Sequence, residues 1–163
     1  MTHRYHESDS LRTAVFAGTF NPFTIGHMSI LQRGLGLFDR VVVVVGVNGE
    51  KTSSESIADN RAEELRKLLR GIPRVEVMAW SGLTVEAARM VGAGFLLRGV
   101  RSVADFEYER NLADINRAIS GIETVVLFAE PSLSMVSSSM VRELQRYGVD
   151  TSRFIPGEAC EKQ

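Results

Sequence analysis

The stretch TAVFAGTFNPFTIGH runs from Thr13 to His27 and joins a short apolar run to a helical pattern. The first five residues suit a buried strand, and apolar residues at helical spacing follow His27. Between the two, Gly18 permits a sharp turn, and Thr24 suits an N-cap, so Gly26 and His27 fall in the first helical turn. Free backbone N–H groups at a helix start bind anions, and the stretch therefore predicts a phosphate site directly after a strand. The alternative is a proline-containing turn with an N-terminal histidine and no ligand.

Apolar β-branched runs alternate with helical patterns along the rest of the chain. The strand candidates are residues 13–17, 40–46, 74–79, 95–97 and 124–128, and the helix candidates are 26–37, 60–70, 83–91, 104–119 and 138–147. Several strands are continuously apolar, which is typical of parallel strands covered on both faces. Five alternations predict an α/β protein in a single domain, with a Rossmann-like open parallel five-stranded sheet and helices on both faces. We expect residues 1–12 to form a mobile N-terminal extension and residues 13–163 to form the domain.

The composition excludes several classes of protein. The 163 residues carry a formal net charge of -1, which argues against a dedicated nucleic-acid binder. The most apolar run, residues 41–47, is about a third of the ~20 residues that a membrane-spanning helix needs. A single cysteine, Cys160, cannot form an internal disulfide and favours a cytoplasmic location. Cys160, His3 and His6 lie in the terminal segments and are poor candidates for a nucleophile or a metal site.

Residues that follow the other strands also suit phosphate. In an open parallel sheet, ligands bind beyond the carboxyl ends of the strands, where the strand order reverses. Arg98 and Arg101 flank a glycine there and could clamp an anion, or they could form a surface pair with Asp105 or Glu107. A serine run, residues 137–139, could bind phosphate at a helix start or could only cap that helix.

Three motifs carry a resemblance to a known family. Residues 18–27, GTFNPFTIGH, resemble the signature of the T/HxGH nucleotidyltransferase superfamily. Residues 97–109, LRGVRSVADFEYE, resemble the RGxRxxxDFxYE stretch that distinguishes the bacterial phosphopantetheine adenylyltransferase family within it. Residues 133–141, LSMVSSSMV, resemble the serine element of the same family. The resemblance extends over residues 13–156, nearly the whole chain.

The resemblance implies transfer of the adenylyl group of ATP to 4′-phosphopantetheine, which gives dephospho-coenzyme A and pyrophosphate. It implies Mg²⁺ with the ATP, a homohexamer, and neither nucleic acid nor membrane as a partner. The catalytic residues it implies are His27, Lys51 and Arg98. For the acceptor it implies Thr19, Lys51, Thr84 and Arg98. For ATP it implies Thr19, Phe20, His27, Gly99, Val100, Arg101, Glu109, Leu133, Ser134, Met135, Val136, Ser137, Ser138 and Ser139.

Besides its C-terminal end, which keeps a Phe-x-Pro at residues 154–156 but stops soon after, the chain departs from the family pattern at three places. Asn21 stands where many members have Asp, Thr84 stands where larger apolar residues are common, and the loop around Lys51 differs. Two alternatives remain: a superfamily enzyme that acts on nicotinate mononucleotide or glycerol 3-phosphate, and a nucleotide-binding module without turnover. If the chain is an enzyme of this superfamily, loops from separate strands are expected to form one positively biased cradle that aligns two phosphate groups.

Overall fold

The computed structural model describes residues 11–47 and 52–157. Its strands are β1 (Thr13–Gly18), β2 (Arg40–Gly46), β3 (Val75–Trp80), β4 (Phe95–Val100) and β5 (Glu123–Phe128). Its helices are α1 (Ile25–Gly34), α2 (Thr52–Leu69), α3 (Thr84–Met90), α4 (Val103–Ser120) and α5 (Ser138–Arg146). Two short 3₁₀ segments, Pro131–Leu133 and Ser152–Phe154, complete the order. Lys51, His3, His6, Cys160 and the first ten residues of the expected extension lie outside the described residues.

The five strands form one parallel sheet in the order β3-β2-β1-β4-β5, which confirms the predicted α/β architecture. The chain builds outward from β1 to β3 and then crosses over to β4 on the other side of β1. The order therefore reverses between β1 and β4, where the connections leave in opposite directions and open a crevice at the carboxyl ends. Gly18 ends β1 and Val100 ends β4, so both motif loops start at this point.

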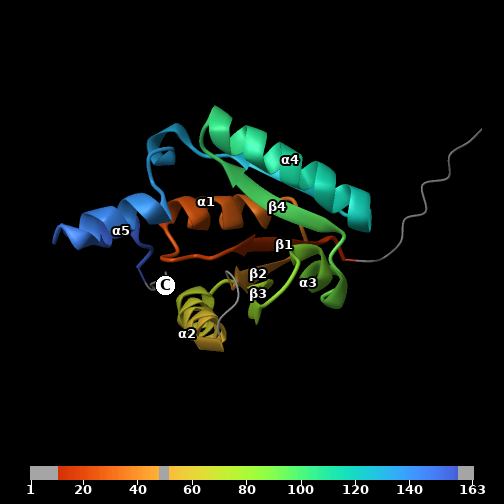
Figure 1. Cartoon of the computed structure of the whole chain (residues 1–163), viewed down its shortest axis with the longest axis horizontal. Helices are drawn as coiled ribbons and strands as arrows, with labels where there is room; N and C mark the ends of the chain where they lie inside the picture. The colour runs from red at the N-terminus through yellow and green to blue at the C-terminus, as the bar shows by residue number, and fades with distance from the viewer. Residues whose placement is uncertain (1–10, 48–51, 158–163) are drawn as a thin grey trace, which may run out of the picture.

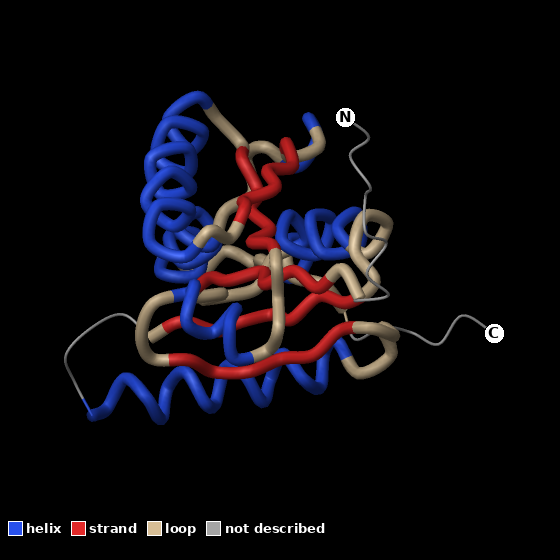
Figure 2. The backbone as a smooth tube through the Cα atoms, turned by 90° about the vertical axis from the view of Figure 1, so that its right-hand side faces the viewer, coloured by secondary structure: helices blue, strands red, loops and turns tan. Residues whose placement is uncertain are grey.

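Helices cover both faces of the sheet (Figures 1 and 2). The alternate side chains Phe16 and Val43 of the central strands pack against α1 and α2 in one apolar cluster. Their neighbours Val15 and Val42 point to the opposite face and pack against α3 in a second cluster. The helix α4 runs along β4 on that second face, while α5 lies beyond the carboxyl ends of the strands. Burial on both faces explains the continuously apolar strands.

Two elements extend three or more residues beyond the ranges that the sequence pattern predicts. The helix α2 begins at Thr52 rather than near Asn60, which lies inside it and is no N-cap. Its buried face, Ala58, Ala62, Leu65 and Leu69, has helical spacing, but the first five residues of the helix, 52–56, are polar and give no apolar signal. The strand β4 continues through Arg98 to Val100, because all three residues of its extension pair with β5.

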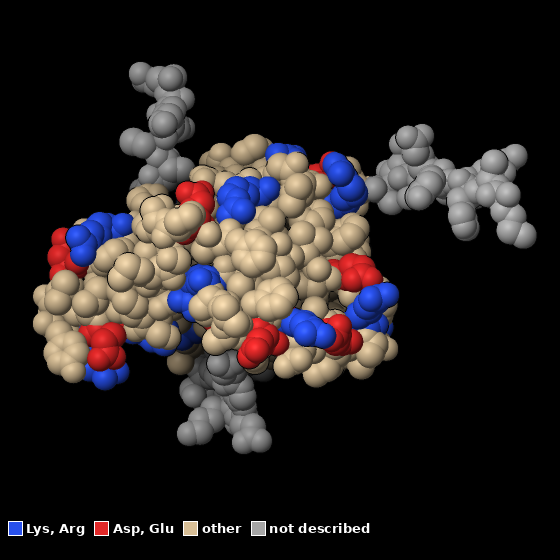
Figure 3. Space-filling view, turned by 90° about the horizontal axis from the view of Figure 1, so that it is seen from above, with Lys and Arg blue, Asp and Glu red and all other residues tan. Residues whose placement is uncertain are grey.

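The surface agrees with the near-neutral composition. On the face in Figure 3, the Lys and Arg residues of the described chain lie among Asp and Glu rather than in one continuous basic area. In the same part of the chain, every helix is too short or too polar to cross a membrane. Arg12, placed by the sequence in the extension, donates to Asp39 through its backbone N–H (2.8 Å) and its guanidinium.

Candidate active site

A cavity of about 300 Å³ opens at the crevice between β1 and β4. This volume is at the lower end of the range for small-ligand sites. Its walls come from the loop after β1, the start of α1, the end of β4, the start of α4 and the loop before α5. The lining residues that the sequence predicts are Thr19, Phe20, His27, Arg98, Gly99, Val100, Arg101, Glu109, Leu133, Val136, Ser137, Ser138 and Ser139. The predicted convergence of separate strand-end loops is therefore present.

The turn after β1 is held in one shape by aromatic packing. Phe20 is buried with a positive φ of 45°, and its ring lies over Gly18. A Cβ at Gly18 would lie 3.0 Å from the Phe20 ring, so a larger residue there would force this ring to move. The rings of Phe20 and Phe23 lie 5.1 and 5.3 Å from the His27 imidazole. Phe20 thus acts on the site through the position of His27 as well as by lining the cavity.

The imidazole of His27 is held by the residue that caps its helix. Thr24 is the N-cap of α1, as the sequence predicts, and its hydroxyl accepts from the His27 backbone N–H (3.4 Å). In return, the backbone N–H of Thr24 donates to Nδ1 of His27 (2.9 Å). Because a backbone N–H can only donate, Nδ1 must be the unprotonated nitrogen. The remaining proton lies on Nε2, and His27 offers this N–H to the cavity that it lines.

The surroundings of His27 keep it uncharged. Burial among the phenylalanine rings, with Arg101 and Arg98 nearby, lowers the pKa of His27 from 6.5 to about 4. Burial is the largest cause, because an imidazolium loses its hydration in this position. At neutral pH, His27 is therefore a hydrogen-bond donor without a formal charge.

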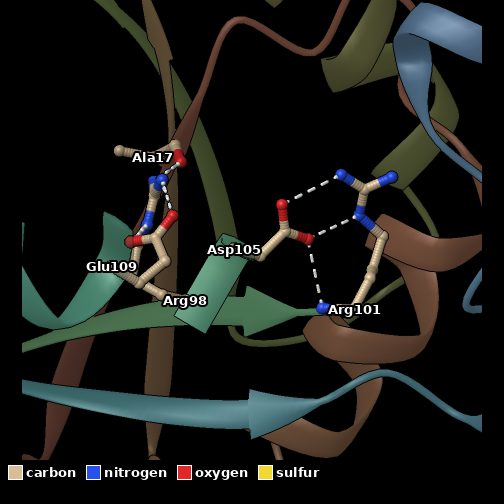
Figure 4. A network of polar contacts seen from close by, with 5 residues as sticks. All are labelled: Ala17, Arg98, Arg101, Asp105 and Glu109. Atoms are coloured by element: carbon tan, nitrogen blue, oxygen red, sulfur yellow. Dashed lines mark hydrogen bonds and ion pairs between the residues drawn. The ribbon is translucent and has the colours of Figure 1, made fainter. Parts of the chain in front are cut away.

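Two arginines at the end of β4 are each paired with a carboxylate of α4 (Figure 4). Arg98 makes a bidentate ion pair with Glu109, through Nε to Oε2 (2.7 Å) and Nη2 to Oε1 (2.6 Å). Arg101 pairs with Asp105, one helical turn before Glu109, through Nε to Oδ2 (3.0 Å). The sequence analysis offered Asp105 or Glu107 as surface partners of these arginines. The pair with Asp105 is present, whereas the pairing of Arg98 with Glu109 was not predicted.

The charge of the cavity differs from the expectation. Its described lining contains two arginines, two carboxylates that neutralise them, and an uncharged His27. The described side chains therefore give no net positive charge, so a positive bias of the cradle in this part of the chain does not come from formal charges. The favourable field for phosphate comes instead from the N-termini of α1 and α5, which meet where Gly26 approaches the carbonyl of Val136.

The serine run lines the cavity, but its hydroxyls are already engaged. Ser137 is the N-cap of α5, and its hydroxyl accepts from the Met140 backbone N–H (3.0 Å). The Ser138 hydroxyl donates to the carbonyl of Pro22 (2.8 Å), and that of Ser139 accepts from Arg142 (3.2 Å). Ser138 thus uses its proton, whereas Ser137 and Ser139 accept and keep an O–H to donate, so the donors left at this helix start are these two hydroxyls and the backbone N–H groups.

Three of the predicted site residues that the structure describes do not line this cavity. Met135 is 83% exposed, and the hydroxyl of Ser134 donates back to the carbonyl of Pro131. Thr84 lines a small recess of about 20 Å³ on the far side of the Arg98–Glu109 pair. Lys51 is outside the described residues.

Sequence reasoning missed the side chains that hold the loop after β1. Arg142 of α5 donates to the carbonyl of Asn21 (2.6 Å), and Arg61 of α2 donates to that of Thr19 (3.4 Å). Together with Ser138 on Pro22, these contacts fix three carbonyls of one loop from two distant helices. Arg142 and Asn21 are 121 residues apart, so no local pattern could have indicated their contact.

Structures with a similar fold are nucleotidyltransferases. A putative nicotinate-nucleotide adenylyltransferase from Vibrio parahaemolyticus superposes with a TM-score of 0.64 at 16% identity, over 89% of this chain and 86% of that chain. A bifunctional NMN adenylyltransferase/ADP ribose pyrophosphatase from Francisella tularensis gives a TM-score of 0.64 at 11% identity, over 91% of this chain and 45% of its own. At these identities, the likeness shows the fold alone.

Sequence relatives are more specific. The family model described as cytidylyltransferase-like matches residues 15–144. A protein of Bacteroides fragilis named phosphopantetheine adenylyltransferase is 50% identical over 90% of this chain and 97% of its own length. One of the same name from Caldanaerobacter subterraneus is 39% identical over 93% of this chain and 95% of its own length. With this identity over nearly the whole length, and with the motif loops gathered at one cavity, the chain belongs to the phosphopantetheine adenylyltransferase family of nucleotidyltransferases.

Proposed function

We propose that this chain transfers the adenylyl group of ATP to 4′-phosphopantetheine, a step of coenzyme A biosynthesis. An oxygen of the acceptor phosphate forms a bond to the α-phosphorus of ATP, and the bond to the bridging oxygen of the β-phosphate breaks. The products are dephospho-coenzyme A and pyrophosphate. The observation that carries the proposal is the single cavity into which two helix N-termini, His27 and Arg98 open.

The reaction needs alignment more than acid–base chemistry. The attacking phosphate oxygen is already ionised at neutral pH, so no general base is required. The two carboxylates of the described lining, Asp105 and Glu109, are both held by arginines, which fits a mechanism without a carboxylate base. Catalysis then comes from holding two phosphates in line and stabilising charge at the α-phosphate.

The residue roles that we propose follow the lining of the cavity. His27 donates its Nε2–H to the α-phosphate, where charge develops in the transition state. Thr19 contacts both substrates, and Arg98 binds the acceptor phosphate together with Lys51. Thr84, across the Arg98–Glu109 pair, lies toward the pantetheine arm. ATP binds against the remaining predicted residues, which are Phe20, Gly99, Val100, Arg101, Glu109 and the loop Leu133, Ser134, Met135, Val136, Ser137, Ser138 and Ser139.

We further propose that ATP acts as its Mg²⁺ complex. The described lining gives no net positive charge against a triphosphate, so a divalent cation supplies charge that the side chains do not. Within residues 11–47 and 52–157, no group of three His, Cys, Asp or Glu is placed to hold a metal. Phosphate oxygens and water are the ligands that Mg²⁺ commonly takes beside a nucleotide. Removal of Mg²⁺ with EDTA is expected to abolish turnover.

A homohexamer in the cytoplasm is the assembly that we propose, on the strength of the family resemblance. Exposed apolar side chains on α4, at Phe106, Tyr108, Ile115 and Ile119, are available for contacts between copies. Light scattering on the purified protein is expected to give about six times the chain mass of 18.0 kDa, whereas a monomer mass would contradict the hexamer. Neither nucleic acid nor a membrane is expected as a partner.

The function is tested by the choice of acceptor. The chain is incubated with ATP, Mg²⁺ and 4′-phosphopantetheine, and dephospho-coenzyme A is identified by mass while pyrophosphate release is measured. Parallel reactions contain nicotinate mononucleotide or glycerol 3-phosphate instead. We expect turnover with 4′-phosphopantetheine to exceed that with either alternative. Equal or greater turnover with nicotinate mononucleotide would assign the chain a different acceptor, and binding of ATP without any product would identify a non-catalytic module.

A further inference from the structure

We propose that Phe23 is a positioning residue for His27: it holds the imidazole in the orientation that the transfer uses and contacts neither substrate. The inference rests on the proposed function and adds a residue to which the family resemblance assigns no role. Phe23 lies in the motif after β1 but is not among the described residues that line the cavity.

Phenylalanine rings enclose the imidazole of His27. The Phe23 ring centroid lies 5.3 Å from that of the imidazole at an interplanar angle of 36°, and the Phe20 ring lies 5.1 Å away at 88°. The Phe16 ring is further away, at 6.3 Å. Phe20 and Phe23 also pack on each other at 5.3 Å, within the range of aromatic contacts. A rotation of the imidazole must therefore displace at least one packed ring.

Phe20 and Phe23 differ in their access to a ligand. Phe20 lines the cavity, so its ring can contact a substrate directly. Phe23 is 4% exposed and belongs to the apolar cluster that packs α1 and α2 on the sheet. A ligand in the cavity meets His27 rather than Phe23. An effect of Phe23 on the reaction must therefore pass through the imidazole or through the backbone of the motif.

The backbone on both sides of Phe23 is fixed as well. Phe23 precedes the N-cap Thr24, and a buried apolar residue at this position fixes the angle at which the chain enters a helix. The N–H of Thr24 donates to Nδ1 of His27 (2.9 Å). Before Phe23, the carbonyl of Pro22 accepts from the Ser138 hydroxyl (2.8 Å). Phe23 thus anchors the segment 22–24, which holds the imidazole both by packing and by a hydrogen bond.

This enclosure keeps water from the imidazole of His27. Burial is the largest cause that lowers the pKa of His27 to about 4. The charged groups that face it are Arg101 and Arg98, and these pair with Asp105 and Glu109. Substitution of a phenylalanine changes none of these groups. A change in the titration of His27 in such a variant therefore reports on its enclosure.

The kinetic test compares Phe23→Leu with Phe38→Leu. Phe38 is buried in the same apolar cluster at 5% exposed, but its aromatic neighbour is Phe95, at 5.4 Å. For Phe23→Leu, we expect kcat to fall about tenfold while KM for each substrate stays within about twofold. For Phe38→Leu, kcat should stay within about twofold. Equal losses of kcat in the two variants would overturn the proposal, and urea unfolding checks that both are folded.

A double-variant cycle with His27→Ala separates positioning from a general effect on the motif. If Phe23 acts through His27, Phe23→Leu should lower the kcat of His27→Ala by less than about twofold, because no imidazole is left to misplace. An additional loss of about tenfold in this background, equal to its loss in the unmodified chain, would overturn the proposal.

NMR of the imidazoles keeps this inference separate from the proposed function, because it needs no substrate. The chain has three histidines, and isotope labelling of histidine alone resolves His27 from His3 and His6. In the unmodified chain, we expect contacts between the rings of His27 and Phe23 and a proton on Nε2. In Phe23→Leu, the pKa of His27 should rise toward its ordinary value of about 6.5 as water reaches the ring.

Missing contacts between these rings in the unmodified chain, or an unchanged His27 pKa in Phe23→Leu, would overturn the positioning role. The first of these measurements stands even where the variant does not fold. If the unmodified chain forms no dephospho-coenzyme A, the proposed function has failed, and the NMR result still decides whether Phe23 holds His27.

Discussion

The backbone N–H of Thr24 donates to Nδ1 of His27 at 2.9 Å, and this contact determines what the imidazole can offer a ligand. Protonation of Nδ1 would turn an acceptor into a donor facing another donor and would break the bond. Burial opposes the same protonation, and the pKa of His27 is lowered to about 4. In the proposed reaction, His27 therefore stabilises charge through the dipole of Nε2–H rather than as a cation. A capping residue thus sets both the start of α1 and the chemistry of the site.

The first prediction concerns turnover without this donor. His27→Ala should lower kcat about 100- to 1000-fold, since one well-placed donor to a developing charge contributes that much. ATP binding measured by calorimetry should change by less than about threefold, because the interaction strengthens mainly in the transition state. Product formation at the unmodified rate would remove His27 from the mechanism.

The second prediction concerns stability and pH. Between about pH 6.5 and pH 4, the unfolded chain binds a proton that folded His27 does not, so the free energy of unfolding should fall as the pH is lowered. The contribution of His27 approaches about 3 kcal/mol across this window. In His27→Asn, the amide oxygen can accept from Thr24 N–H but does not titrate. Urea unfolding at about pH 7 and about pH 5 should show that the free energy of unfolding falls less in this variant than in the unmodified chain. Equal losses in both proteins would contradict the low pKa.

The third prediction concerns the packing of α1 on β4. A Cβ at Gly34 would collide with the side chain of Leu97, so this glycine lets the helix lie close to the sheet. Gly34→Ala should cost about 1–3 kcal/mol in chemical unfolding. Gly94→Ala is the matched control, because its Cβ meets no described atom within 4 Å. A control variant as unstable as Gly34→Ala would show that the close approach is not the cause.

The fourth prediction concerns the loop after β1. Arg142 holds the carbonyl of Asn21 at 2.6 Å and thereby joins the loop after β1 to α5, the two segments that we propose bind phosphate. Arg142→Ala should raise KM for ATP about tenfold by loosening both loops. Arg146→Ala removes the same charge one turn later on α5, and its KM should stay within about twofold. Similar effects of the two substitutions would point to the charge of α5 rather than to this contact.

The loops of the site were predictable because topology brings them together. Parallel strands point their carboxyl ends the same way, so the residues after β1 and β4 had to meet once the order reversed between them. The pairing of Arg98 with Glu109 also has a signal in the sequence. Asp105 and Glu109 are four residues apart and share a helix face, whereas Glu107 lies on the exposed side. The positions of the acidic residues around α4 therefore distinguish Asp105 and Glu109, which can reach the arginines, from Glu107.

Other features have no local signal. The helix α2 begins eight residues before Asn60, in a run of polar residues. We attribute the helical conformation of this run to the packing of the later, apolar part of α2 against the sheet. The lack of net charge in the described lining results from ion pairs between α4 and the arginines at and just after the end of β4, and these require the helix to be placed on the sheet before they can be recognised. The contacts of Arg142 and Arg61 with the loop after β1 likewise depend on the packing of distant helices.

We propose that segments far apart in the sequence bind one nucleotide at the point where the strand order of the sheet reverses. Hydrogen exchange of backbone amides, followed by mass spectrometry with and without MgATP, tests it most directly. We predict slower exchange in residues 18–20, 25–27, 99–101 and 137–139 together, since these segments line one cavity. Slower exchange in a single one of these segments, or only at sites away from the cavity, would contradict the account.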